Sequence, residues 1–113
     1  MIRNMSNPDP LLSEREIDDA ARMFKALSNP HRLRIFKELS CCLAGRVAIG
    51  PAEQFGNCQR DFASRLGLAP STVSHHFKEL RQAGLVHMKR DGKDMHFWVD
   101  AKAIQTLRAL LGE

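Results

Sequence analysis

Three cysteines stand out among the residues that could do chemistry, because they flank a single segment of the chain. Cys41 and Cys42 are adjacent, and Cys58 follows a stretch, residues 44–57, that we expect to be a long loop with a functional role. An odd number of cysteines in a chain that we expect to be cytoplasmic argues against a disulfide framework. Metal ligation, redox chemistry and simple burial remain as alternatives.

The predicted surroundings of Cys58 favour its thiolate form. We expect a short helix from Cys58 to Leu66, which would place the thiol at a helix N-terminus. Arg46 and Arg60 are near in sequence and would add positive charge. Both effects lower the pKa of a thiol, so the sequence predicts a reactive cysteine.

A second set of polar residues shares one side of a helix predicted over residues 71–81. Val73, Phe77 and Leu80 recur at helical spacing and predict the buried side. Small hydroxyl groups and basic side chains on the opposite side could bind phosphates and the edges of the nucleobases in the major groove of DNA. The predicted DNA-contacting residues of this helix are Ser71, Thr72, Ser74, His75, Lys78 and Arg81.

The other histidines are expected to have structural roles. His76 lies close to the apolar side of the same helix, so we predict a hydrogen-bonded packing residue rather than a base-reading one. His31 and His87 are expected to be surface or packing residues rather than ligands.

The helices that precede this segment can be assigned from capping and periodicity. Ser13, followed three residues later by Glu, is a capping-box pattern and predicts a helix over Glu14–Leu27. Asn29 and Pro30 suit the first positions of a second helix, which we expect to end near residues 40–43.

The period changes from helical to extended after the helix over residues 71–81. Asp91-Gly92 lies between two extended runs and predicts a β-hairpin over residues 85–99. Arg90 and Lys93 bracket the tip of this hairpin and are predicted to contact the flanking DNA. A last helix is expected over about residues 101–111.

The order of these elements predicts a mainly α fold with a β-hairpin wing, the winged helix-turn-helix. Residues 13–113 would form one domain after a flexible arm at 1–12, with the helix-turn-helix at 58–81 and the wing at 85–99. The first and last helices carry more apolar side chains than one helix-turn-helix with its hairpin can bury, so we expect a homodimer. The predicted dimerisation residues are Phe24, Leu27, Ile104, Leu107, Leu110 and Leu111.

Composition narrows the class of function. The formal net charge of +4 permits binding to nucleic acid without establishing it. No apolar run has the length of a membrane span, so no membrane partner is expected. No Cys–His–acid arrangement supports an enzyme, and no obligatory cofactor is expected. A winged fold that binds protein is a further alternative; loss of specific DNA binding on changes at Ser71 and Ser74 would count against it.

Two segments resemble the ArsR/SmtB family of metal-responsive repressors. Residues 26–35 are similar to the second helix of that family, and residues 70–80 with 83–86 are similar to its recognition helix and wing entry. The resemblance covers about residues 14–111. It implies a homodimer built on the first and last helices, bound to double-stranded operator DNA near its own promoter and released by an inducer.

The resemblance also bears on the cysteines. Arsenic-sensing members carry a Cys-x-Cys pair just before an Asp; here Cys58 stands three residues before Asp61, but Arg60 fills the second position. Cys41 and Cys42 would supply the missing thiolates. Three thiolates suit trivalent arsenic or antimony, which bind three sulfurs in a pyramid, whereas zinc prefers four ligands.

The expected function is repression of a metalloid-resistance operon, relieved when trivalent arsenic or antimony binds all three cysteines, from one subunit or from two. A redox-responsive regulator, or one that responds to cadmium or lead, is the alternative on the same fold. The zinc site of other members is not expected. On the last helix Asp100 is followed by Lys102 and Gln105, and there is no histidine after His96.

Overall fold

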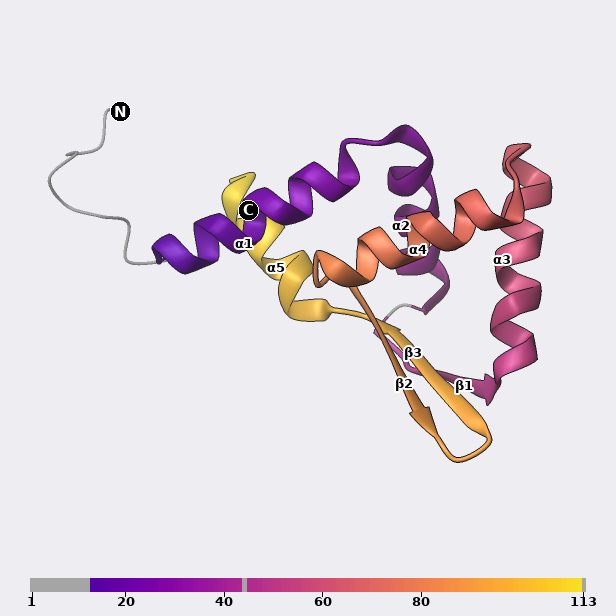
Figure 1. The fold of residues 1–113 in the computed structure, drawn as a ribbon. Coiled ribbons are helices and arrows are strands. Elements are labelled where there is room, and N and C mark those ends of the chain that lie inside the picture. Colours follow the sequence, from indigo (N-terminus) through magenta and orange to yellow (C-terminus); the bar gives the residue numbers. More distant parts are fainter. Residues whose placement is uncertain (1–12, 44, 113) are drawn as a thin grey trace, which may run out of the picture.

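The computed structural model describes residues 13–43 and 45–112, so the arm predicted at residues 1–12 lies outside the described residues. Figure 1 shows a helical body from which a β-hairpin projects. In chain order the described elements are α1 (Glu14–Leu27), α2 (Pro30–Leu43), β1 (Ala48–Pro51), α3 (Ala52–Leu66), α4 (Pro70–Gln82), β2 (Val86–Asp91), β3 (Asp94–Val99) and α5 (Ala101–Leu110).

The predicted winged helix-turn-helix is present. The helices α3 and α4 form the pair, and the antiparallel strands β2 and β3 form the wing. The capping box is confirmed, since the Ser13 hydroxyl accepts a hydrogen bond from the Glu16 amide at 3.2 Å. None of the helices among the described residues is both long and apolar enough to span a membrane.

The loop predicted over residues 44–57 is wrong for most of its length. Ala48–Pro51 forms β1, which pairs with β3 and gives the sheet order β1-β3-β2. The helix α3 then begins at Ala52, well before Cys58. The strand is too short to show alternation, and Pro51 supplies no side-chain cap that would announce the helix. Gly56 is a poor helix former, so the first turns of α3 are also difficult to predict from helix propensity.

The hairpin turn lies one residue later than predicted. Asp91 pairs with Asp94, so Gly92 and Lys93 are the two central residues of the turn, rather than Asp91 and Gly92. Gly92 has a φ of 61°, and both primed turns that commonly join two-residue hairpins require a positive φ at this first central position. Lys93 therefore lies within the turn at the tip of the wing.

The core joins the helix pair to the sheet through aromatic side chains. Phe62 of α3 meets Phe77 of α4 with ring centroids 5.8 Å apart, and Phe77 meets Phe97 of β3 at 6.0 Å. The predicted stripe is confirmed, because Val73 and Leu80 are fully buried beside Phe77. The helices α3 and α4 are therefore in direct contact through their buried aromatic side chains.

Candidate functional site

The outward face of α4 is built as the sequence predicted. Pro70 occupies its first turn, where the missing N–H costs nothing. The side chains opposite the buried stripe are all exposed: Ser71, Thr72, Ser74, His75, Lys78 and Arg81. One of them already has a partner, since the Ser74 hydroxyl donates to Oε1 of Gln59 on α3 at 3.0 Å. Ser74 thus links the recognition face to α3.

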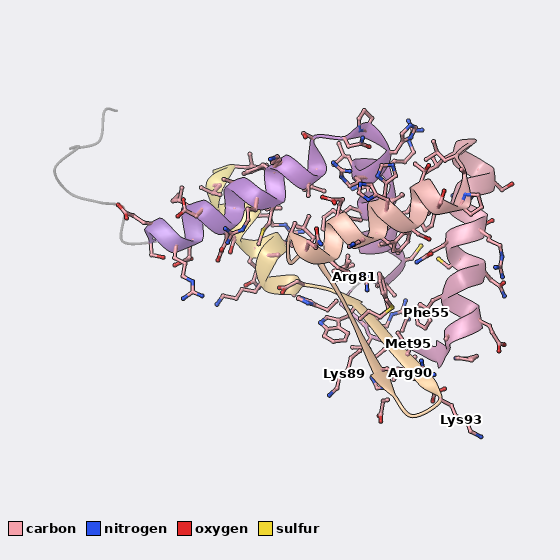
Figure 2. The ribbon with its side chains drawn as sticks, viewed as in Figure 1. Phe55, Arg81, Lys89, Arg90, Lys93 and Met95 are labelled. Atoms are coloured by element: carbon pink, nitrogen blue, oxygen red, sulfur yellow. The ribbon has the colours of Figure 1, made fainter. Side chains whose placement is uncertain are left out.

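The wing adds exposed positive charge. Arg90 and Lys93 lie at the tip as predicted, and Figure 2 shows them with Lys89 along the hairpin and with Arg81 near the end of α4. Sequence reasoning missed Lys89. Its position next to Arg90 near the predicted tip could have indicated it, because both faces of a projecting hairpin are open to solvent and Lys89 and Arg90 are both exposed.

His76 is the hydrogen-bonded packing residue that the sequence predicted. Its side chain is 6% exposed, and Nη1 of Arg32 lies 3.3 Å from its Nδ1. Burial lowers the pKa of His76, and the Arg32 cation lowers it further. Nε of Arg32 also donates to the Ala26 carbonyl at 2.6 Å. The pair therefore ties α4 to the junction of α1 and α2.

The three cysteines fall into two environments. Cys42 of α2 and Cys58 of α3 line one cavity of about 440 Å³ between these helices and the sheet. Cys41 does not line this cavity. All three thiols have some contact with solvent, and none forms a disulfide.

The predicted activation of Cys58 is wrong. Cys58 lies inside α3 rather than at its N-terminus, so the helix dipole does not favour its thiolate. Burial raises the pKa of the Cys58 thiol, and Asp61 raises it further, while Arg65 opposes them. Arg46 instead donates hydrogen bonds to backbone carbonyls of α2, and Arg60 donates to the side-chain oxygen of Asn57.

The described residues hold no cluster of three or more His, Cys, Asp or Glu side chains arranged to bind a metal ion. The three cysteines are therefore not assembled as one site. Two of them share a cavity, and the third lies beside it on the same turn of α2.

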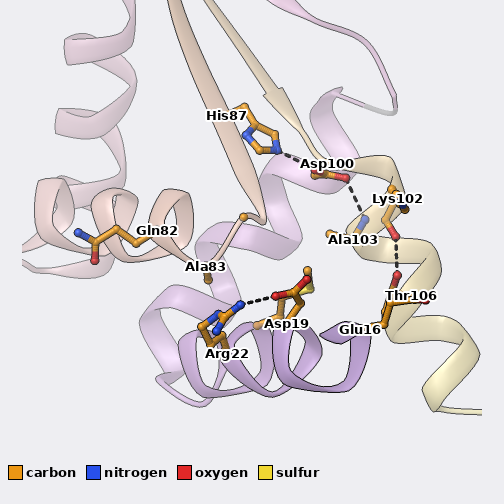
Figure 3. Close-up of a pocket in the computed structure, with 12 residues that line it drawn as sticks. Glu16, Asp19, Arg22, Gln82, Ala83, His87, Asp100, Lys102, Ala103 and Thr106 are labelled. Atoms are coloured by element: carbon orange, nitrogen blue, oxygen red, sulfur yellow. Dashed lines mark hydrogen bonds and ion pairs between the residues drawn. The ribbon is translucent and has the colours of Figure 1, made fainter. Parts of the chain in front are cut away.

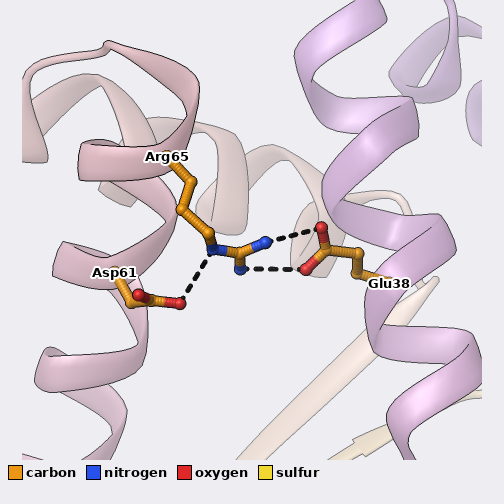
Figure 4. A network of polar contacts seen from close by, with 3 residues as sticks. All are labelled: Glu38, Asp61 and Arg65. Atoms are coloured by element: carbon orange, nitrogen blue, oxygen red, sulfur yellow. Dashed lines mark hydrogen bonds and ion pairs between the residues drawn. The ribbon is translucent and has the colours of Figure 1, made fainter.

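An ion-pair network that sequence reasoning missed lines this cavity. The guanidinium of Arg65 donates to both oxygens of Glu38 at 2.8 and 2.9 Å, and its Nε donates to Asp61 at 3.0 Å (Figure 4). The hydrogen bond from Arg65 lowers the pKa of Glu38. Because Glu38 belongs to α2 and Arg65 to α3, this network holds together the two helices that carry the thiols.

His87 has the packing role that was expected. Its Nε2 lies 2.7 Å from Oδ2 of Asp100, whose Oδ1 accepts the Ala103 amide at the start of α5 (Figure 3). Burial alone would raise the pKa of Asp100, but the hydrogen bonds from His87 and Ala103 outweigh it and the pKa is lowered. Asp100 thus serves as the N-cap of α5.

The predicted dimerisation residues differ in exposure. Phe24 is 41% exposed on α1 and Leu111 is 72% exposed just after α5, whereas Leu107 is 8% exposed and packs in the core of its own chain. Leu27, Ile104 and Leu110 are half-buried. Sequence reasoning missed Ile17 and Leu33, which are also exposed apolar side chains of the α1–α2 pair.

Comparison with known proteins agrees with this geometry. A family model described as "Bacterial regulatory protein, arsR family" matches residues 57–88. The chain is 30% identical to the HTH-type transcriptional regulator YgaV of Escherichia coli over 83% of each protein. It is 29% identical to the cadmium resistance transcriptional regulatory protein CadC homolog of Staphylococcus aureus over 79% of this chain, and spans 64% of that relative's length.

A solved structure shows the same fold. The homodimeric winged helix-turn-helix DNA-binding domain of a possible ArsR-family regulator from Mycobacterium bovis superposes with a TM-score of 0.54 and 24% identity. The match covers 91% of this chain and 86% of that one. The chain belongs to the ArsR family of bacterial regulatory proteins. It is a transcriptional regulator of the winged helix-turn-helix type, and its relatives are regulators rather than enzymes.

Proposed function

We propose that this chain is a homodimeric repressor that leaves its operator when a thiophilic ligand binds the cysteines of α2 and α3. The observation that carries the proposal is the shared cavity of Cys42 and Cys58. The helix that bears Cys58 also contacts the recognition helix, through Phe62 against Phe77 and through Gln59 to Ser74. A ligand that moves α3 relative to α2 would therefore reorient the DNA-binding face.

DNA binding follows from the exposed face of α4 and from the basic wing. A recognition helix of this kind enters the major groove. Its hydroxyl groups and basic side chains contact the phosphates and the edges of the nucleobases. In a dimer, two such helices reach successive major grooves when they lie about 34 Å apart. The wing residues Lys89, Arg90 and Lys93 would then meet the flanking backbone.

Dimerisation through α1 and α5 would cover the apolar side chains that these helices leave exposed. Phe24 and Leu111 are large, apolar and exposed, and exposed apolar side chains that lie together mark an interaction surface. Ile17 extends the same patch along α1. The Mycobacterium bovis relative with this fold is itself described as homodimeric.

The ligand class follows from thiol chemistry. Arsenous acid condenses with thiols, and each thiol proton leaves as water with one hydroxide of arsenic, so a raised thiol pKa does not block the reaction. Peroxide sensing requires a thiolate, which the raised pKa of Cys58 disfavours. Trivalent arsenic or antimony is therefore the favoured inducer. Cadmium is the next ligand to test, because one relative is a cadmium resistance regulator.

The test is release of DNA from the full-length reduced protein, followed by fluorescence anisotropy of a labelled fragment from upstream of its own gene. Arsenite, antimonite, cadmium, zinc and hydrogen peroxide are added in parallel. The proposal predicts release by arsenite and antimonite without an oxidant. Release by peroxide alone would replace it with a redox function, and failure to bind any upstream fragment would overturn it.

A further inference from the structure

One side chain of the recognition face is hydrogen-bonded to the neighbouring helix. The hydroxyl of Ser74, on α4, donates to Oε1 of Gln59, on α3, at 3.0 Å. Ser74 is exposed, whereas Gln59 is half-buried and lies three residues before Phe62, on the side of α3 that packs against α4. The two side chains therefore meet at the surface, where the two helices of the helix-turn-helix come together.

The direction of this hydrogen bond is not the usual one for a serine within a helix. Such a serine has a nearer acceptor in the carbonyl oxygen four residues earlier in the same helix. Ser40 and Thr106 donate to that acceptor in α2 and α5, at 2.8 and 3.1 Å. Ser74 donates across to α3 instead. Gln59, rather than the backbone of α4, therefore sets the direction of the Ser74 proton.

This arrangement limits what Ser74 can do at the DNA. A serine hydroxyl has one proton to donate and two lone pairs that accept. Because the proton of Ser74 is given to Gln59, the hydroxyl can only accept hydrogen bonds from DNA. In the major groove the amino groups of adenine and cytosine donate, whereas guanine and thymine present an oxygen acceptor at the corresponding place. A hydroxyl held in this way therefore distinguishes the two bases that carry an amino group from the other two.

We infer that Gln59 is a positioning residue for base recognition: it holds the Ser74 hydroxyl as an acceptor, so that Ser74 selects adenine or cytosine at one base of each half-site. The Nε2 group of Gln59 is not used in that bond. It can donate to a phosphate, since the first helix of such a pair crosses the DNA backbone. The role rests on the DNA-binding part of the proposed function and uses neither the cysteines nor the inducer.

A positioning role differs in its effects from a merely structural one. The buried rings of Phe62 and Phe77 already hold α3 against α4, and an exposed hydrogen bond between neutral groups adds little to that packing. A structural bond would change the affinity for all DNA sequences alike. A bond that fixes the Ser74 proton changes which base is preferred at one position, so base preference is the quantity to measure.

The test is selection of binding sites from a random pool of double-stranded DNA by the full-length reduced protein, with sequencing of the bound fraction. The position that Ser74 contacts is the one whose preference is lost in Ser74→Ala. There the native protein should enrich adenine or cytosine about ten-fold over guanine or thymine. Gln59→Ala leaves the Ser74 proton free to donate to guanine or thymine. The preference at that position should then fall to within about two-fold, while other positions keep theirs.

Two further variants keep the result specific. Gln59→Glu retains an acceptor for the Ser74 proton, so it should keep the preference for adenine or cytosine. It should bind all sequences more weakly, because a carboxylate repels phosphate. Gln54→Ala removes the same group from an exposed position of α3 and should leave the preference unchanged. Alanine favours a helix at least as well as glutamine, and a circular dichroism spectrum confirms that each variant is folded.

The outcomes separate this role of Gln59 from the proposed function. Failure of the native protein to enrich any sequence would overturn both. Enrichment of a defined sequence in which no position depends on Ser74, or in which that position prefers guanine or thymine, would overturn the role of Gln59 alone. So would a preference that Gln59→Ala leaves unchanged, or one that Gln59→Glu or Gln54→Ala removes to the same extent.

Discussion

At the scale of single residues, His76 connects protonation to stability. Arg32 can only donate, so Nδ1 of His76 must accept and the ring must be neutral. Burial and the nearby cation lower the pKa of His76 below its ordinary value of 6.5. The unfolded chain therefore binds a proton that the folded chain resists, and folding becomes less favourable as the pH falls through that value.

The first prediction follows from this linkage. His76→Asn keeps an acceptor for Arg32 and removes the titration, so the variant should lose less stability than the native chain between about pH 7.5 and about pH 5.5. Urea unfolding midpoints at the two pH values provide the measurement. Because the other histidines are common to both proteins, an identical loss of stability would show that His76 does not resist protonation.

At the scale of elements, α3 gives a matched pair of glycine substitutions. Gly67 ends the helix with a φ of 68°, in the left-handed region, whereas Gly56 lies inside the helix with room for a methyl group. Gly67→Ala should lower the free energy of unfolding by about 1 kcal/mol. Gly56→Ala should raise it by about 0.5–1 kcal/mol. Thermal unfolding measures both; changes of the same sign would contradict the described bounds of α3.

The recognition helix gives the third prediction. Lys78 is exposed on the outer face of α4, and Lys102 is also exposed, on α5. Lys78→Gln should weaken binding to all DNA sequences and reduce the slope of log affinity against log salt by about 1, as expected for loss of one phosphate contact. Lys102→Gln is the charge-matched control. Equal effects of the two changes would mean that α4 does not face the DNA.

The elements differ in how far the sequence predicts them, and the reason is the range of their interactions. The helices α1 and α4 carry local information, a capping box in one and a buried stripe of Val73, Phe77 and Leu80 in the other. β1 exists because Ala48 pairs with Phe97, nearly half a chain away, and four residues alone cannot show it. The cavity depends on side chains from six elements, α2, β1, α3, α4, β2 and β3, so the sequence could not predict it either.

At the scale of the whole molecule, the apolar surface of α1 and α5 makes the monomer incomplete. Phe24 and Leu111 remain exposed although both helices also contribute to the core. We expect a second copy to cover them, which would set the distance between the two recognition helices. DNA affinity should therefore depend on residues far from the DNA.

The fourth prediction tests this dependence. Phe24→Glu should convert the dimer to monomer in sedimentation velocity and weaken operator binding, because one head makes half the contacts. Ile49 on β1 is 59% exposed and also apolar, so Ile49→Glu is the matched control and should stay dimeric. A dimeric Phe24→Glu protein would place the interface elsewhere.

In the proposed function, the thiols between α2 and α3 decide when the recognition helix leaves DNA. The most direct measurement is arsenite-induced release of the operator fragment from the native protein and from Cys58→Ser, with DNA affinity measured before arsenite is added. We expect the variant to bind DNA as tightly as the native protein and no longer to release it. Unchanged release by Cys58→Ser would mean that this thiol does not control DNA binding.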